Sequence, residues 1–180
     1  MTESREHDLA NLDLSPTEMR AMGEAVLARV VAHLAGLPDA PSCGDFRGIE
    51  ALCRSMRESV PEQGTALDAL LAPLFDEWIP RSFTAPGPGY LAYIPGGGIY
   101  PAALADFIAD TTNRYTGIWQ AAPALVQLEA NALDWLRDWM QFPAETRGLF
   151  TTGGSMAMFN AIACAREKLL GDDIRAGTMY

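Results

Sequence analysis

The residues best placed to do chemistry form a glycine turn late in the chain, Thr152-Gly153-Gly154-Ser155. The apolar and β-branched run at 148–152 predicts a buried strand before the turn, and the apolar spacing from about 156 to 170 predicts a helix after it. The first N–H groups of a helix have no intrahelical partner, and the helix dipole adds about half a positive charge there. Because glycines let an anion approach the backbone and Ser155 adds a hydroxyl donor, the turn is a candidate phosphate site. The alternative is an ordinary strand-to-helix turn in which Ser155 only caps the helix.

The turn matches none of the common nucleotide-binding motifs. No lysine follows the glycines, so it is not a Walker motif, and the spacing is not G-x-G-x-x-G. Lys168 is the single lysine of the chain and lies near the far end of the predicted helix. We expect its side chain to face solvent and to be a weak nucleophile.

Two pairs of aspartates are also spaced by one helical turn, Asp106 with Asp110 and Asp134 with Asp138. Either pair could bind a metal ion or act as acid and base, but exposed acids on a helix usually form a solvated face. The three cysteines include no C-x-x-C pair and no zinc-ligand spacing, which is typical of free thiols in a reducing compartment. We therefore expect no metal site.

Composition and charge exclude several classes of function. Of the 180 residues, 49% are hydrophobic and 20% are charged, which is typical of a globular domain and not of a disordered tail. The formal net charge of −10 disfavours nucleic acid and anionic membranes as partners. The N-terminus has no apolar signal-peptide region, and no run approaches the roughly 18 apolar residues of a membrane span. These features predict a cytoplasmic protein.

The elements that lead to the glycine turn begin with helices. The run Ser15-Pro16-Thr17-Glu18 is typical of a capping box with proline at the first helical position, and Gly36 should close this helix. A further helix should begin near 65–68, and we expect either a kink or a late start at Pro73, because proline disrupts a helix interior.

The character of the chain changes at 80–101, where proline, glycine and aromatic residues are crowded together. This stretch cannot be a regular helix, and long loops of this kind are often functional. Another long helix should begin at Pro123 and end at Pro143. Its buried side should carry Leu125, Leu128, Leu133, Leu136 and Met140. With the strand at 148–152, the C-terminal part would begin an α/β unit.

Short motifs between about Tyr90 and Arg166 follow one another in a specific order and spacing. They are Ala92-Tyr93-Ile94-Pro95, Tyr100-Pro101-Ala102, Leu104-Ala105-Asp106, Asn113, Trp119-Gln120-Ala121-Ala122-Pro123-Ala124, Leu128-Glu129, Asp134-Trp135-Leu136, Phe150-Thr151-Thr152-Gly153-Gly154-Ser155 and Ala165-Arg166. In these motifs the chain resembles the group II pyridoxal-phosphate-dependent amino-acid decarboxylases, the group of the aromatic-L-amino-acid and glutamate decarboxylases.

The resemblance implies an α/β fold in three parts. Residues 1–80 would be a helical N-terminal arm used for dimerisation, and 81–122 a pocket-lining loop and helix. Residues 123–180 would start an aspartate-aminotransferase-like large domain (PLP fold type I), truncated here. Members of the family are intertwined dimers, so the resemblance also implies a homodimer.

The resemblance assigns roles to individual residues. The cofactor would be pyridoxal 5'-phosphate, with its phosphate held by Gly153, Gly154 and Ser155. The amino-acid substrate would contact Tyr93, Pro95 and Gly96, and also Tyr115 and Gly117 in a pocket across the dimer interface. The family also needs a lysine that forms a Schiff base with the cofactor. Lys168 matches no such motif, so we expect that lysine beyond Tyr180 and no catalytic residue within this chain.

The implied activity is that of a carboxy-lyase that releases CO2 from an L-amino acid via an aldimine. This chain would supply the phosphate cradle and part of the substrate wall, and would be inactive alone. Two alternatives stay open: a non-catalytic truncated chain that acts as a dimerisation or assembly module, and the same fold catalysing transamination. The substrate also stays open, because Gly96 stands where aromatic-amino-acid members often have threonine.

Overall fold

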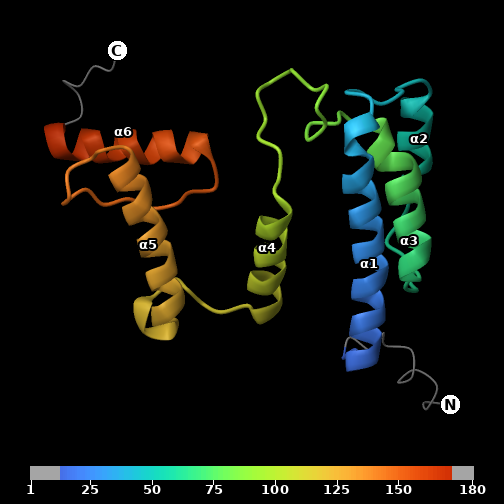
Figure 1. Ribbon diagram of the computed structural model, residues 1–180, viewed down its shortest axis with the longest axis horizontal. Coiled ribbons are helices and arrows are strands. Elements are labelled where there is room, and N and C mark those ends of the chain that lie inside the picture. The colour runs from blue at the N-terminus through green and yellow to red at the C-terminus, as the bar shows by residue number, and fades with distance from the viewer. Residues whose placement is uncertain (1–12, 172–180) are drawn as a thin grey trace. The chain divides into compact units, whose positions relative to one another are not determined.

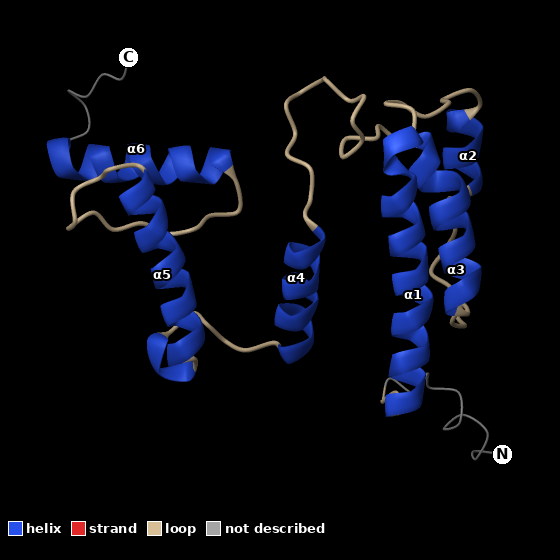
Figure 2. Ribbon diagram, in the orientation of Figure 1, coloured by secondary structure: helices blue, strands red, loops and turns tan. Residues whose placement is uncertain are grey.

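The computed structural model describes residues 13–171, and this part of the chain is helix and loop (Figures 1 and 2). Contacts divide the chain into two compact units, with the boundary between Asp106 and Phe107. The α-helices are α1 (Pro16–Gly36), α2 (Ile49–Ser55), α3 (Leu67–Pro73), α4 (Tyr100–Thr112), α5 (Pro123–Trp139) and α6 (Gly154–Leu170). The shorter helical turns are η1 (Leu37–Asp39), η2 (Leu74–Trp78), η3 (Ile79–Arg81) and η4 (Trp119–Ala121).

Helix α1 begins and ends where the sequence predicts. The Glu18 N–H donates to Ser15 Oγ at 3.3 Å, and the Ser15 N–H donates to Glu18 Oε2 at 2.8 Å, which confirms the capping box. In the first unit α1 lies beside α3 (Figure 1), and Arg29 Nη1 of α1 donates to Asp76 Oδ1 at 2.8 Å. Leu71 of α3, only 7% exposed, is buried in this unit. The small core of the first unit therefore lies on α3.

Pro73 changes the type of helix, where its position in the sequence led us to expect a kink or a late start. Helix α3 ends at this residue, and the chain continues as the π-helical turn η2 and the 3₁₀ turn η3. Proline has no N–H to donate, and its ring clashes with the carbonyl group one turn earlier. The regular hydrogen-bond ladder is therefore interrupted while the chain keeps turning in the helical direction.

Two short segments of the first unit run antiparallel to each other. The Gly44 N–H donates to the Ser82 carbonyl at 2.9 Å, and the Thr84 N–H donates to the Ser42 carbonyl at 3.1 Å. They flank an isolated β-bridge between Cys43 and Phe83. A Cβ built on Gly44 would overlap the carbonyl oxygen of Pro80. Only glycine therefore fits at position 44.

In the second unit α5 ends before Pro143, the residue expected to end it. The Phe142 N–H donates to the Arg137 carbonyl at 3.0 Å, and the Gln141 N–H donates to the Asp138 carbonyl at 3.1 Å. Gln141 has a left-handed backbone with φ +56°. These three features form a Schellman motif, in which a left-handed residue reverses the chain and satisfies the last carbonyls. We call residues 141–148, which lead back from this reversal, the return segment.

The strand expected at 148–152 is not formed in the described chain. These residues are irregular, and the single β pairing among residues 13–171 is the bridge between Cys43 and Phe83. A strand requires a neighbour that exchanges backbone hydrogen bonds with it, and the described second unit consists of helices and loops. The α/β fold class therefore stays a prediction, while the helical character of the preceding part is confirmed.

Apolar side chains are widely exposed in both units. Among the apolar residues described, only Leu71 and Ala122 are buried. The face of α5 expected to be buried is largely open, because Leu125, Leu128, Leu136 and Met140 are 36% to 64% exposed. Exposed apolar area on this scale is characteristic of interaction surfaces. None of the described helices combines the length and apolar character needed to cross a membrane.

Candidate functional site

The glycine turn opens α6 in the second unit. Gly153 is the residue before the helix and has φ +156° and ψ 175°, a conformation almost restricted to glycine. Its carbonyl accepts from the Ala157 N–H at 3.0 Å and from Thr151 Oγ1 at 3.0 Å. The helix begins at Gly154, two residues earlier than predicted, and Ser155 lies inside its first turn without capping it. The interpretation of Ser155 as a simple helix cap is therefore wrong.

The turn has unused hydrogen-bond donors. The N–H groups of Gly154, Ser155 and Met156 precede the first intrahelical donor, and no acceptor among the described residues bonds to them. The Ser155 hydroxyl is exposed and also has no described partner. The first turn of α6 contains no acidic residue that would repel an anion.

The space in front of these donors is open. A Cβ built on either Gly153 or Gly154 would meet no atom within 4 Å. Three backbone donors and the positive end of the helix dipole therefore face accessible space, and the exposed Ser155 hydroxyl lies in the same turn. This set of donors fits the phosphate group of a phosphorylated ligand.

The predicted substrate residues fall in both units. Tyr115 and Gly117 lie together in the second unit, where the Tyr115 ring covers Gly117. Tyr93, Pro95 and Gly96 lie in the exposed loop of the first unit. Tyr115 thus lies with Gly117 in one unit, and Tyr93, Pro95 and Gly96 share one loop of the other unit. The described hydrogen bonds and ion pairs do not link Tyr115 or Gly117 to the α6 turn.

The backbone of the first-unit loop is strained at two neighbouring residues. Tyr93 and Ile94 have φ values of +59° and +50°. Left-handed backbone is rare for β-branched residues such as Ile94, and such strain clusters at functional segments. Both side chains are exposed, that of Ile94 by 97%. The sequence did not reveal this conformation, because neither residue is a glycine or an asparagine.

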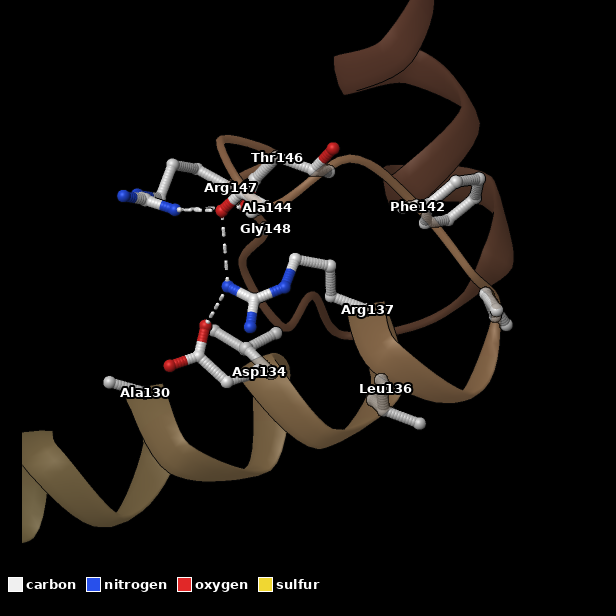
Figure 3. Close-up of a pocket in the computed structure, with 11 residues that line it drawn as sticks. Ala130, Asp134, Leu136, Arg137, Phe142, Ala144, Thr146, Arg147 and Gly148 are labelled. Carbon is white, nitrogen blue, oxygen red and sulfur yellow. Dashed lines mark hydrogen bonds and ion pairs between the residues drawn. The ribbon is translucent and has the colours of Figure 1, made fainter.

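Arg137 is a residue that sequence reasoning missed. It lies beside a cavity of about 510 Å³ between α5 and the return segment, where Figure 3 shows its guanidinium group between Asp134 and the Ala144 carbonyl. The hydrogen bond to Asp138 and the charge of Asp134 raise the pKa of Arg137 above its ordinary value. Both aspartates, which could have formed an acid-base or metal pair, are thus engaged by an arginine. The spacing Asp134-x-x-Arg137-Asp138 was the available signal.

Lys168 lies far from the glycine turn on the same helix. It is exposed in the last turn of α6, whereas Ser155 is in the first. At a rise of about 1.5 Å per residue, the two backbones are about 20 Å apart along the helix. Lys168 therefore cannot reach a ligand whose phosphate is held by the turn.

Comparisons with known protein sequences point to one family. Residues 50–175 match the family described as "Pyridoxal-dependent decarboxylase conserved domain". The chain is 32% identical over 170 residues to an aromatic-L-amino-acid decarboxylase of Bacillus atrophaeus, an alignment that covers 94% of this chain and 35% of the relative. The chain thus spans about a third of the length of that relative.

Two solved structures have similar folds. The crystal structure of Oryza sativa TDC with PLP and tryptamine aligns with a TM-score of 0.74 and 22% identity, over 89% of this chain and 37% of the other. That of Rhodiola rosea 4-hydroxyphenylacetaldehyde synthase aligns with a TM-score of 0.77 and 19% identity, over 89% of this chain and 36% of the other. At this identity the likeness shows the fold, and it extends over both units.

Proposed function

Since the chain belongs to the pyridoxal-dependent decarboxylase family, we propose that it forms part of an enzyme that releases CO2 from an L-amino acid. The observation that carries this proposal is the start of α6, where the N–H groups of Gly154, Ser155 and Met156 and the Ser155 hydroxyl have no partner among the described residues. Pyridoxal phosphate, when bound, supplies the electron sink that amino-acid decarboxylation requires.

The proposed role of the turn is to bind and orient the cofactor. The N–H groups of Gly154, Ser155 and Met156 and the Ser155 hydroxyl would donate hydrogen bonds to the phosphate oxygens. Hydrogen bonds to an ionised acceptor are shorter and stronger than neutral ones, and the dipole of α6 favours the same charge. Gly153 keeps the approach open because it carries no side chain.

The proposed role of the two aromatic groups is to contact the amino-acid substrate. Tyr93, Pro95 and Gly96 would be one set of substrate contacts, and Tyr115 and Gly117 would be a second set, contributed across the dimer interface. The exposure of Tyr93 and Tyr115 supports this assignment, since both rings are available to a ligand. We assign no Schiff-base role to Lys168, because its place at the end of α6 puts it out of reach.

The organisation of the whole protein follows from the same proposal. Residues 1–80 would serve as an arm that covers a second copy, 81–122 as the pocket-lining part and 123–180 as the start of an α/β large domain. The exposed apolar side chains of α1 support the homodimer, because such faces need a partner. We further propose that the enzyme works in the cytoplasm.

The test uses the full-length protein. The protein is saturated with pyridoxal phosphate and incubated with L-amino acids labelled at the carboxyl carbon, and released CO2 is counted. We expect CO2 from at least one amino acid, and none after borohydride treatment of the loaded protein. A transfer of the amino group to a keto acid without CO2 release would replace this function by transamination. A protein that neither binds the cofactor nor releases CO2 would favour an assembly module.

A further inference from the structure

We propose that Arg137 is a positioning residue for the phosphate turn, an inference that rests on the function proposed above. Its side chain is 18% exposed, whereas the arginines of the other ion pairs described are 32% to 91% exposed. A charged side chain is seldom covered to this extent unless it is paired. The contacts of Arg137 show what it holds in place.

On one side Arg137 is fixed to its own helix. Its Nη1 donates to Asp134 Oδ1 at 2.6 Å, and its Nε and Nη2 both donate to Asp138 Oδ1, at 3.0 and 2.9 Å. The two carboxylates thus hold the plane of the guanidinium group from two directions. A guanidinium group is suited to this because its donors form a rigid fork.

On the other side Arg137 holds the return segment. Its Nη1 also donates to the Ala144 carbonyl at 3.3 Å (Figure 3), and its own carbonyl accepts from the Phe142 N–H at 3.0 Å. Arg147 Nη1 donates to the same Ala144 carbonyl at 3.1 Å. Arg137 therefore holds the return segment at two points. Its main-chain carbonyl bonds to the beginning of the segment, and its side chain bonds to the middle.

The return segment leads directly to the phosphate turn. A Cβ built on Gly148 would lie 3.4 Å from Leu133 Cδ2, so the end of the segment lies against α5 as well. The short stretch 149–152 then joins Gly148 to Gly153. Binding groups must be held to within about 0.5 Å to work. Movement of the return segment would be passed on to the donors at the start of α6.

The experiment uses the full-length protein without cofactor and the variant Arg137→Met. Arg54→Met is the matched control, because Arg54 makes only an exposed ion pair with Glu50 at 3.7 Å. Three quantities are measured: the dissociation constant of pyridoxal phosphate, that of pyridoxal, which has no phosphate, and amide hydrogen exchange at 144–156. Arg137→Lys is added because it keeps the charge without the fork.

We expect Arg137→Met to weaken the binding of pyridoxal phosphate about tenfold, which is the scale of a lost hydrogen bond to a charged group. Amide hydrogen exchange at 144–156 should become faster. The dissociation constant of pyridoxal should change by less than about threefold, because pyridoxal has no phosphate group for the turn to bind. Arg137→Lys should fall between wild type and Arg137→Met, and Arg54→Met should match wild type. If the binding of both ligands weakened equally, the role of Arg137 would be merely structural and the proposal would be overturned. Unchanged amide hydrogen exchange at 144–156 would also overturn it.

The design separates the two proposals. If the wild-type protein binds no pyridoxal phosphate, the proposed function fails, and the exchange rates at 144–156 still show whether Arg137 holds the segment. If Arg137→Met does not fold, Asp138→Asn takes its place, because it removes the charge of one of the two carboxylates that hold the guanidinium group. We then expect Asp138→Asn to weaken the binding of pyridoxal phosphate about threefold and to leave the binding of pyridoxal unchanged. No difference between the two ligands in that variant overturns the positioning role.

Discussion

The ring of Tyr115 lies so close over Gly117 that a Cβ at position 117 would be 2.6 Å from the tyrosine Cζ and hydroxyl oxygen. Real Cβ atoms do not approach other atoms so closely, so any side chain at 117 must move the ring. Tyr115 is 66% exposed, and its ring is free to swing into solvent when displaced. The absence of a side chain at 117 therefore sets the position of an aromatic group that we assign to the substrate pocket.

The variant Gly117→Ala tests this relationship. We expect the KM of the full-length enzyme for its amino-acid substrate to rise about tenfold, because displacement of a contact group by about 1 Å is costly. The dissociation constant of pyridoxal phosphate should not change. Gly64→Ala is the control, since a Cβ there meets nothing within 4 Å. An unchanged KM in Gly117→Ala would remove Tyr115 from the proposed pocket.

The variant Ser155→Ala tests the phosphate turn. Loss of one hydroxyl donor to a charged acceptor should raise the dissociation constant of pyridoxal phosphate about tenfold. Fluorescence titration of the full-length protein without cofactor measures it. Ser155→Thr keeps the hydroxyl and should bind nearly as well as wild type. If Ser155→Ala and wild type bind equally, the hydroxyl does not contact the phosphate.

A pair of glycine substitutions tests the packing of the first unit in opposite directions. Gly44→Ala should lower the free energy of unfolding by about 1–3 kcal/mol, because its Cβ collides with the backbone of Pro80 and Arg81. Gly23→Ala should raise it by about 0.5–1 kcal/mol, because Gly23 is inside α1 and its Cβ would meet nothing within 4 Å. Urea unfolding of the full-length protein measures both. Equal effects would contradict the contact between Gly44 and Pro80.

The capping box of α1 makes a pH-dependent contribution to stability. Hydrogen bonds from the side chain and then the backbone of Ser15 hold the pKa of Glu18 below its ordinary value of 4.5. A carboxyl group with a depressed pKa stabilises the folded state above its ordinary pKa, and this contribution disappears as the pH falls through the lowered value. Wild type should therefore be more stable than Glu18→Gln at pH 7, and the difference in stability should be smaller at pH 3.

Thermal unfolding at both pH values checks this expectation. Glu62→Gln serves as the control, because Glu62 is exposed in a loop outside any helix. This variant shows how the removal of a carboxyl group outside a capping box affects stability at each pH. A difference between wild type and Glu18→Gln that is the same at both pH values would mean that the capping box does not titrate with Glu18.

Features set by neighbouring residues could be predicted from the sequence. The capping box at Ser15 and Glu18, the helix change at Pro73 and the open glycine turn at Gly153 each depend on a few adjacent side chains. The order of short motifs was sufficient to indicate the family, which the match over residues 50–175 confirms. The site residues themselves stay predictions until the variants above are measured.

Features that depend on distant parts of the chain could not be predicted. A strand at 148–152 needs a neighbouring strand, and a run of apolar and β-branched residues says nothing about whether one is present. The end of α5 is set by Gln141, whose left-handed backbone is unusual for a residue other than glycine. Arg137 was not singled out from the sequence, because its contact with the Ala144 carbonyl exists only once the chain has reversed.

The exposed apolar faces link folding to association. With Leu71 and Ala122 as the only buried apolar residues described, this part of the chain has little core of its own. Its stability must come from surfaces that cover α1, α5 and α6. By mass action, any surface supplied by another molecule makes the melting temperature rise with protein concentration. A dilution series of melting curves would therefore report on assembly as directly as a measurement of molecular mass.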